Sequence, residues 1–172
     1  TSGTQTAMVV FAGIGASGTG NTNTESWNGS SWTSSGAMSS GRYRLGSAGT
    51  QTAALAYGGY STSTLNATEE YGGSSWTSGG NLGTARYGGG SAGIQTAALF
   101  ISGTTGPTVQ TAVEQYDGSA WTAGTAVPTG KNLNNGAGTT SAALMFGGLP
   151  HTTATFEFTG AGANLIKTIA TS

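Results

Sequence analysis

The side chains of this sequence that could do chemistry are its charged residues, which are few and regularly spaced. Five Lys and Arg and six Asp and Glu are the only charged residues among 172. Six of them recur in three matching places, where a glutamate is followed seventeen residues later by a basic residue: Glu25 and Arg42, Glu69 and Arg86, Glu114 and Lys131. The structural interpretation is a partly buried, hydrogen-bonded Glu–Arg pair, or a capped turn, that ties strands or neighbouring units together. A ring of basic groups holding an anion is the functional alternative, and we favour the structural interpretation.

The other candidates for catalysis do not form a set. His151 is the only histidine, cysteine is absent and no carboxylates cluster, so the sequence offers neither a set of metal ligands nor a base beside a nucleophile. Gly13 to Gly18 fits the dinucleotide-binding pattern G-x-G-x-x-G, but residues 19–25 do not resemble the helix that this site needs. We therefore expect no enzyme activity and no cofactor.

Tryptophan recurs seven residues after each of the three glutamates, at Trp32, Trp76 and Trp121. Tryptophan rings stack on sugars in glycan-binding sites, but a ring at a fixed place in a repeat more often fills the apolar space between units. We expect these three residues to be structural.

A repeated unit must position these residues. The phrase Gly-Thr-Gln-Thr-Ala returns with small changes at Gly3, Gly49, Gly93 and Gly138, so its starting glycines lie 46, 44 and 45 residues apart. The fourth copy keeps aromatic residues at Phe156-Glu-Phe158 but lacks the tryptophan. We interpret the chain as one domain of four copies, approximately residues 1–41, 42–85, 86–130 and 131–172, and it could be the C-terminal part of a longer chain.

Each copy is predicted to contain short strands. The segment 52–57 is apolar on both faces and ends at a Gly-Gly pair, as a buried strand does before a turn. Residues 68–71 alternate polar and aromatic, a Gly-Gly-Ser turn follows, and Trp76 opens another strand. A fourth extended piece covers residues 86–93, and no segment has helical periodicity. Four short strands in about 45 residues indicate an all-β fold of propeller type.

The order of motifs in the second copy resembles the kelch repeat, whose blade runs di-glycine, acidic residue with Tyr, Trp, and then Arg. The matching residues are Gly58-Gly59, Glu69-Glu70-Tyr71, Trp76 and Arg86. Copies one and three depart from the di-glycine with Ala12-Gly13 and Ser102-Gly103. The resemblance implies a β-propeller of about four four-stranded blades. The repeated segment Thr-Gln-Thr-Ala-Ala-Leu and the small proportion of charged residues also resemble repeat arrays in virion proteins of marine tailed phages.

How such a propeller would close is open at the sequence level. Copy one begins inside its unit, because no basic residue and no first strand precede Gly3. Upstream sequence could complete the unit, or the C-terminal segment 163–172 could return to do so. That segment could equally be the outer strand of copy four. A closed four-bladed ring is feasible.

Binding is expected at the loop between the repeated phrase and the glutamate, because this loop varies in length and wording. It covers residues 14–24, 60–68, 104–113 and 149–155 in the four copies. The candidate binding-face residues are Tyr60, Ser61, Thr62, Thr104, Thr105 and His151.

These features predict a non-enzymatic structural and attachment module at an extracellular or virion surface, in contact with other virion subunits or with a host-surface glycan or protein. The alternative is a lectin-like, receptor-binding propeller on a tail fibre or cell surface. Because Tyr60 is the one aromatic residue that we find in these loops, we lean slightly toward an assembly role. A net charge of −1 with five basic residues gives no stripe for nucleic acid, and the apolar runs are too short for membrane insertion.

Overall fold

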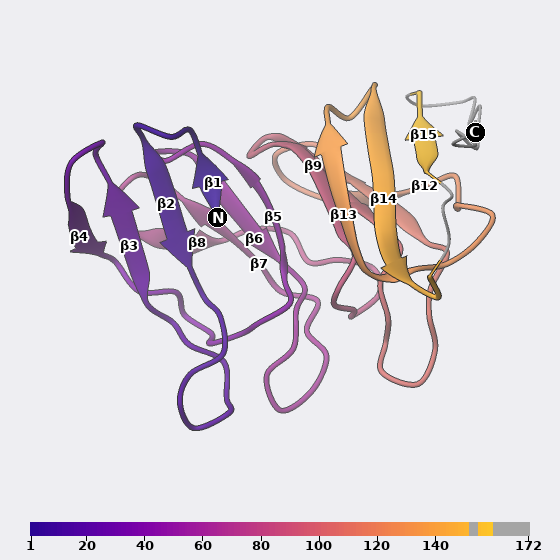
Figure 1. Ribbon diagram of the computed structural model, residues 1–172, viewed down its shortest axis with the longest axis horizontal. Coiled ribbons are helices and arrows are strands. Elements are labelled where there is room, and N and C mark those ends of the chain that lie inside the picture. The colour runs from indigo at the N-terminus through magenta and orange to yellow at the C-terminus, as the bar shows by residue number, and fades with distance from the viewer. Residues whose placement is uncertain (152–154, 160–172) are drawn as a thin grey trace.

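The computed structural model describes residues 1–151 and 155–159, and these residues form four antiparallel sheets without a helix. The all-β prediction is therefore confirmed. Each sheet is a meander, in which every strand pairs with the strand before it in the chain. Figure 1 shows the sheets in chain order from indigo to yellow, with long loops that project from one edge. Among the described residues no helix has the length and apolar character to cross a membrane.

The strands are short, and the sheets repeat the same plan. Sheet one contains β1 (Ser2–Gly3), β2 (Met8–Phe11), β3 (Thr24–Trp27) and β4 (Trp32–Ser35). Sheet two contains β5 (Gly46–Gly49), β6 (Ala54–Tyr57), β7 (Thr68–Tyr71) and β8 (Trp76–Ser78). Sheet three contains β9 (Gly90–Ile94), β10 (Ala97–Ile101), β11 (Val113–Tyr116) and β12 (Trp121–Gly124). Sheet four contains β13 (Asn132–Gly138), β14 (Ala143–Leu149) and β15 (Phe156–Phe158).

Side-chain caps and glycines make the tight turn between the third and fourth strands. The carboxylate of Asp117 accepts hydrogen bonds from the backbone N–H groups of Ser119 and Ala120, both at 2.8 Å. Gly118, next to it, has φ of +97°, a conformation that glycine adopts without steric cost. Asn28 caps the same turn of sheet one in the same way. These turns place Trp32, Trp76 and Trp121 at the start of each outer strand.

Sheet one differs from its predicted start. The two residues of β1 pair with β2, with Ser2 opposite Val9 and Gly3 opposite Met8. A short first strand is therefore present where none was expected. It has two residues, whereas β5 has four and β9 has five, so copy one does begin inside its unit. The C-terminal segment 163–172, which we considered as a returning strand, lies outside the described residues.

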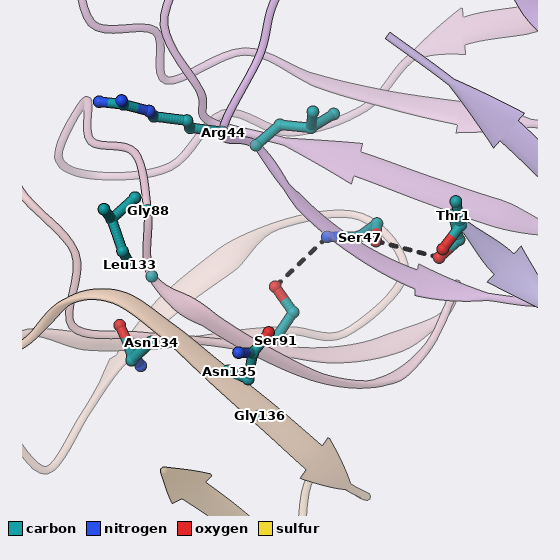
Figure 2. Close-up of a pocket in the computed structure, with 11 residues that line it drawn as sticks. Thr1, Arg44, Ser47, Gly88, Ser91, Leu133, Asn134, Asn135 and Gly136 are labelled. Carbon is teal, nitrogen blue, oxygen red and sulfur yellow. Dashed lines mark hydrogen bonds between the residues drawn. The ribbon is translucent and has the colours of Figure 1, made fainter. Parts of the chain in front are cut away.

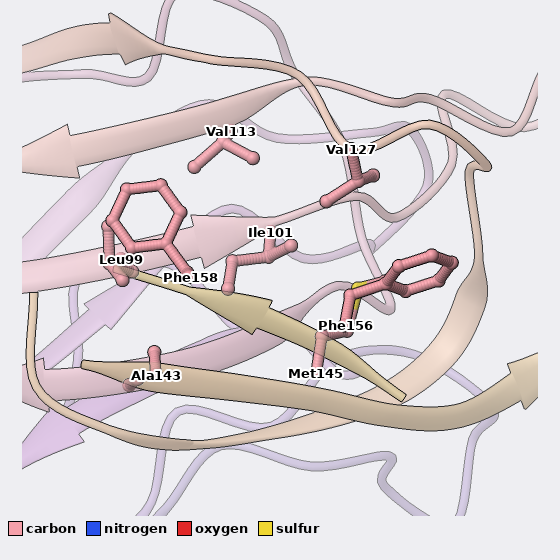
Figure 3. Close-up of a cluster of buried hydrophobic side chains, with 9 residues drawn as sticks. Leu99, Ile101, Val113, Val127, Ala143, Met145, Phe156 and Phe158 are labelled. Carbon is pink, nitrogen blue, oxygen red and sulfur yellow. The ribbon is translucent and has the colours of Figure 1, made fainter. Parts of the chain in front are cut away.

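The sheets stack face to face, and the hydrophobic core is divided into three layers between them. Alternate residues of each second strand point to opposite neighbours, because side chains alternate along a strand. The layer between sheets one and two contains Val9, Phe11, Ala54, Ala56 and Tyr71, and the next contains Leu55, Tyr57, Ala98, Phe100 and Tyr116. The third, between sheets three and four, contains Leu99, Ile101, Ala143, Met145 and Phe156 (Figure 3).

The inner strands β1, β5, β9 and β13 lie next to one another in that order. Serines join them: Ser2 donates from its hydroxyl to Ala48 O at 3.1 Å, and Ser47 N donates to the Ser91 hydroxyl at 3.3 Å. Glycine allows the close approach, because a Cβ on Gly136 would lie 2.7 Å from Ser91 O. The stack is thus held together along its inner edge by backbone and hydroxyl contacts.

Candidate binding face and the buried ion pairs

Two buried ion pairs link the start of a sheet to its third strand. Arg42 donates to the carboxylate of Glu69 at 2.6 Å, and Arg86 donates to the carboxylate of Glu114. Both guanidinium groups are fully buried and also donate to backbone carbonyls, for example from Arg42 to Ala67 O at 2.7 Å. Burial lowers the pKa of each guanidinium, and the neighbouring carboxylate acts in the opposite direction.

The same carboxylates fasten the segment that leads into each sheet. The second oxygen of Glu69 accepts a hydrogen bond from Ser39 N at 2.7 Å, and that of Glu114 accepts one from Gly83 N at 2.6 Å. Each glutamate therefore holds an arginine and a linker N–H at once, which is a structural role.

The observed ion pairs do not join the residues that lie seventeen positions apart in the sequence. Arg42 lies 27 residues before Glu69, and Arg86 lies 28 residues before Glu114, so each pair joins residues of one sheet. Glu25, in the equivalent place of sheet one, is exposed. Its predicted partner Arg42 is committed to Glu69, so pairing across seventeen residues is not what the structure shows.

Sheet four replaces this arrangement in a coordinated way. Lys131 takes the place of the arginine, is fully buried and donates from Nζ to Pro150 O at 3.2 Å. Phe156 takes the place of the glutamate, and Pro128, which has no N–H, takes the place of the linker donor. The carboxylate and the donor that it would accept from are therefore lost together.

Two of the three repeated tryptophans pack between sheets. The Trp76 ring lies 4.8 Å from Phe11 of sheet one, and the Trp121 ring lies 4.7 Å from Tyr57 of sheet two. Trp32 is different, because it is 47% exposed and contacts the Trp27 ring within its own sheet. The sequence alone did not distinguish Trp32 from the others.

The variable loops do lie along one edge of the stack, where the three loops of sheets one to three are seen in Figure 1. Within the loop of sheet two, Tyr60 pairs with the backbone of Tyr43, which precedes β5. The ring of Tyr60 stands between those of Tyr43 and Tyr87, at 5.6 and 5.3 Å. Three tyrosines from two sheets therefore form one half-buried cluster at this edge.

Arg44 completes this cluster. Its guanidinium carbon lies 5.9 Å from the Tyr43 ring centre and 5.8 Å from that of Tyr87, within the range of cation–π contacts. The side chain is exposed, and neither of the two ion pairs in the described part of the chain includes it. This guanidinium is thus available to a ligand.

The repeat gives Arg44 a backbone conformation that glycine adopts more easily. Its φ is +55°, and the equivalent Leu133 has φ of +57°, whereas the same place in sheet three is Gly88 with φ of +68°. A non-glycine residue in this region costs about 1–3 kcal/mol. Both side chains are exposed, so core packing does not explain why they replace glycine.

Arg44 and Leu133 line one cavity of about 530 Å³ that runs along the inner strands (Figure 2). Its walls are mainly polar or glycine residues: Thr1, Arg44, Leu45, Ser47, Gly88, Gly89, Ser91, Leu133, Asn134, Asn135 and Gly136. Sheets two, three and four all contribute to it, together with the first residue of the chain. We call Arg44, Tyr43, Tyr60, Tyr87 and this cavity the candidate binding face.

The predicted loop residues contribute unequally. Tyr60 belongs to the cluster, and of the two residues that follow it Ser61 is half-buried and Thr62 is exposed. His151 is exposed in the loop of sheet four. Thr104 does not fit the prediction, because it is only 2% exposed and its hydroxyl donates to Thr108 O at 3.0 Å. Thr105 is half-buried and its hydroxyl donates to the same carbonyl at 3.3 Å, so both shape their own loop.

The variable loops do not include Tyr43, Arg44 and Tyr87, because these residues precede the inner strands. The sequence signal for the two tyrosines is the dipeptide Arg-Tyr, which occurs at residues 42–43 and again at 86–87. No protein-family model matches this chain, and a search of curated proteins gave no match.

Proposed function

We propose that this chain is a non-enzymatic attachment module of an extracellular or virion surface, and that its candidate binding face holds the target. The four stacked meanders would be consecutive blades of a kelch-like propeller, with the inner strands toward its axis. The kelch-like order of motifs supports this arrangement, as does the side-by-side order of the inner strands. The phage-like repeat wording supports a virion surface in particular.

The observation that carries the proposal is the strained Arg44 beside the tyrosine cluster. A residue held at positive φ with an exposed, unpaired guanidinium is typical of a site that needs that side chain. Guanidinium groups bind carboxylates and sulfates through parallel hydrogen bonds, and tyrosine rings offer flat faces and hydroxyls. A host-surface glycan that carries an anionic group fits this chemistry, and an acidic protein surface is the other target of the same class.

The test is a glycan array that includes neutral and acidic sugars, probed with the wild-type domain, Arg44→Gly and Ala12→Gly. Both substitutions place glycine where φ is positive, so neither should lower the melting temperature. We expect Arg44→Gly to weaken binding about tenfold or more, because a charge-assisted hydrogen bond contributes about 1.5–3 kcal/mol. Ala12→Gly is the matched control, because Ala12 has φ of +61° but lies outside the candidate binding face, and it should keep most of the binding. Equal binding by all three proteins would contradict the role of Arg44.

An assembly role without a soluble ligand is the second candidate. It is favoured by the apolar residues that sheet four exposes, Leu144, Phe146 and Leu149. A domain that binds no glycan of the array, but associates with other subunits, would favour this second function.

A further inference from the structure

The two end sheets expose faces that the inner sheets bury. Leu144 and Phe146 of β14 are 38% and 41% exposed. Their counterparts in β6 and β10 are Leu55, Tyr57, Leu99 and Ile101, none more than 1% exposed, and each of these faces the next sheet in the stack. Sheet four therefore presents the apolar face that elsewhere receives a following sheet.

Sheet one presents the opposite face. Met8 and Val10 of β2 are half-buried, whereas the matching residues of β6, Ala54 and Ala56, are fully buried against the preceding sheet. Trp32 is the most exposed of the repeated tryptophans. This face is the one that elsewhere receives a preceding sheet.

The internal layers show how two such faces fit together. The aromatic residue at the fourth place of the second strand lies against the tryptophan of the next sheet, as Phe11 lies against Trp76 and Tyr57 against Trp121. Phe146 is the fourth residue of the second strand in sheet four, and Trp32 is the repeated tryptophan of sheet one. The exposed faces of sheets four and one therefore each carry one partner of this aromatic contact.

A hydrogen bond also joins each of these tryptophans to the preceding sheet, with the donor on one sheet and the acceptor on the other. Trp76 donates from Nε1 to the hydroxyl of Thr24 at 2.9 Å, and Trp121 donates to the hydroxyl of Thr68 at 2.9 Å. These threonines precede the repeated glutamate of the preceding sheet.

The donor and the acceptor are absent together in the next repeat of the sequence. Sheet three has Val113 at the threonine place, and the sequence of copy four has no tryptophan seven residues after Phe156. Sheet four has threonine again, at Thr155. Because Phe156 packs toward sheet three, alternation along the strand directs Thr155 to the other side. Sheet four therefore has a threonine hydroxyl that can accept from a tryptophan, although no sheet of the described chain follows it in sequence.

We propose that the Leu144 and Phe146 face of one copy packs against the Met8, Val10 and Trp32 face of a second copy. Phe146 then contacts Trp32, and Trp32 Nε1 donates to Thr155. The contact is head to tail, so it joins different surfaces of the two copies and can close into a ring of chains. It goes beyond the proposed attachment function and does not depend on it, although several copies in one ring would present several binding faces.

The test measures the mass of the purified chain by light scattering across a dilution series, for the wild type, Phe146→Glu and Trp32→Glu. The wild type should reach at least twice the chain mass of 16.8 kDa. Each variant alone should be monomeric, since every copy lacks the same half of the contact. Mixing the two variants should restore a one-to-one pair, because one supplies an intact sheet four and the other an intact sheet one.

Ile94→Glu is the matched control, because Ile94 is 55% exposed but lies on neither end face. It should associate as the wild type does, and circular dichroism should show that all variants are folded. A wild type that stays monomeric at every concentration overturns the proposal, as does a mixture that fails to pair. A monomeric double variant, Trp32→Cys with Phe146→Cys, that forms a disulfide within one chain would also overturn it, because the face would then pack against the chain's own first sheet.

Discussion

Arg86 shows at the scale of one residue how a chain with few charges uses them. Its guanidinium donates to Ser102 O at 2.9 Å, to Phe100 O at 3.1 Å and to the Glu114 carboxylate, and it lies 4.6 Å from the centre of the Phe100 ring. A buried guanidinium with several acceptors is held in one geometry. Arg86 therefore fixes the position at which the chain enters sheet three.

Removing this guanidinium should be costly, because it leaves the Glu114 charge buried without its partner. We expect Arg86→Met to lower the free energy of unfolding by about 3–5 kcal/mol. The control is Glu25→Gln, which alters the exposed glutamate of the same repeat place and should change stability by less than about 0.5 kcal/mol. Urea denaturation measures both, and similar small losses in the two variants would contradict a buried, structural pair.

The sequence made the charged residues conspicuous but could not assign their partners. The constant interval of seventeen residues joins Glu69 to Arg86, yet the structure pairs each of them with a different residue. A meander returns the third strand to the start of its own sheet, so the relevant neighbours are set by strand order rather than by the most regular spacing. Arg44 was missed because its φ, which marks it as unusual, is invisible in a sequence.

At the scale of the element, the strands follow directly from local patterns. The predicted strand at residues 68–71 matches β7, and Trp76 does open β8. Turn residues set these limits, since Gly73 and Gly118 adopt positive φ and Asp117 caps its turn. The inner strands were harder to place, because Gly-Ser-Ala-Gly has little strand propensity and is held by its neighbours.

The glycines of the inner strands should be sensitive to a single added methyl group. A Cβ on Gly136 would lie 2.7 Å from Ser91 O and 2.8 Å from Ser91 N, which would force β13 away from β9. We expect Gly136→Ala to destabilise the chain by about 1–3 kcal/mol. Gly72→Ala is the control, because nothing lies within 4 Å of its Cβ. Thermal unfolding compares the two, and an unchanged melting temperature for Gly136→Ala would argue against this close approach.

At the scale of the whole molecule, each sheet depends on its immediate neighbours. Within residues 1–151 and 155–159, sheets two and three are covered on both faces, whereas sheets one and four are covered on one. The number of repeats could be predicted from the sequence because the repeated segments are clearly similar. The exposure of the outer faces could not, since Trp32 and Trp76 have similar local sequences and differ only in which residues pack beside them.

This arrangement predicts a gradient of local stability. Amides of β6 and β10 should exchange with solvent more slowly than those of β2 and β14, because opening an end sheet exposes one layer rather than two. Hydrogen exchange followed by mass spectrometry on the Phe146→Glu variant would measure this without association between copies. Equal protection of β10 and β14 would show that the four sheets open as one unit.

The ion pairs also bear on how such a chain can change its number of repeats by recombination. All side-chain and linker partners of the Glu69 carboxylate lie between Ser39 and Glu69, and those of Glu114 lie between Gly83 and Glu114. An exchange between copies at the turns, residues 72–75 or 117–120, transfers each set intact. An exchange between the arginine and its glutamate can join a charged residue to a copy such as the fourth, which has Phe156 and Pro128. A gain or loss of a repeat by exchange at the turns therefore leaves every buried carboxylate of these sets with its own arginine.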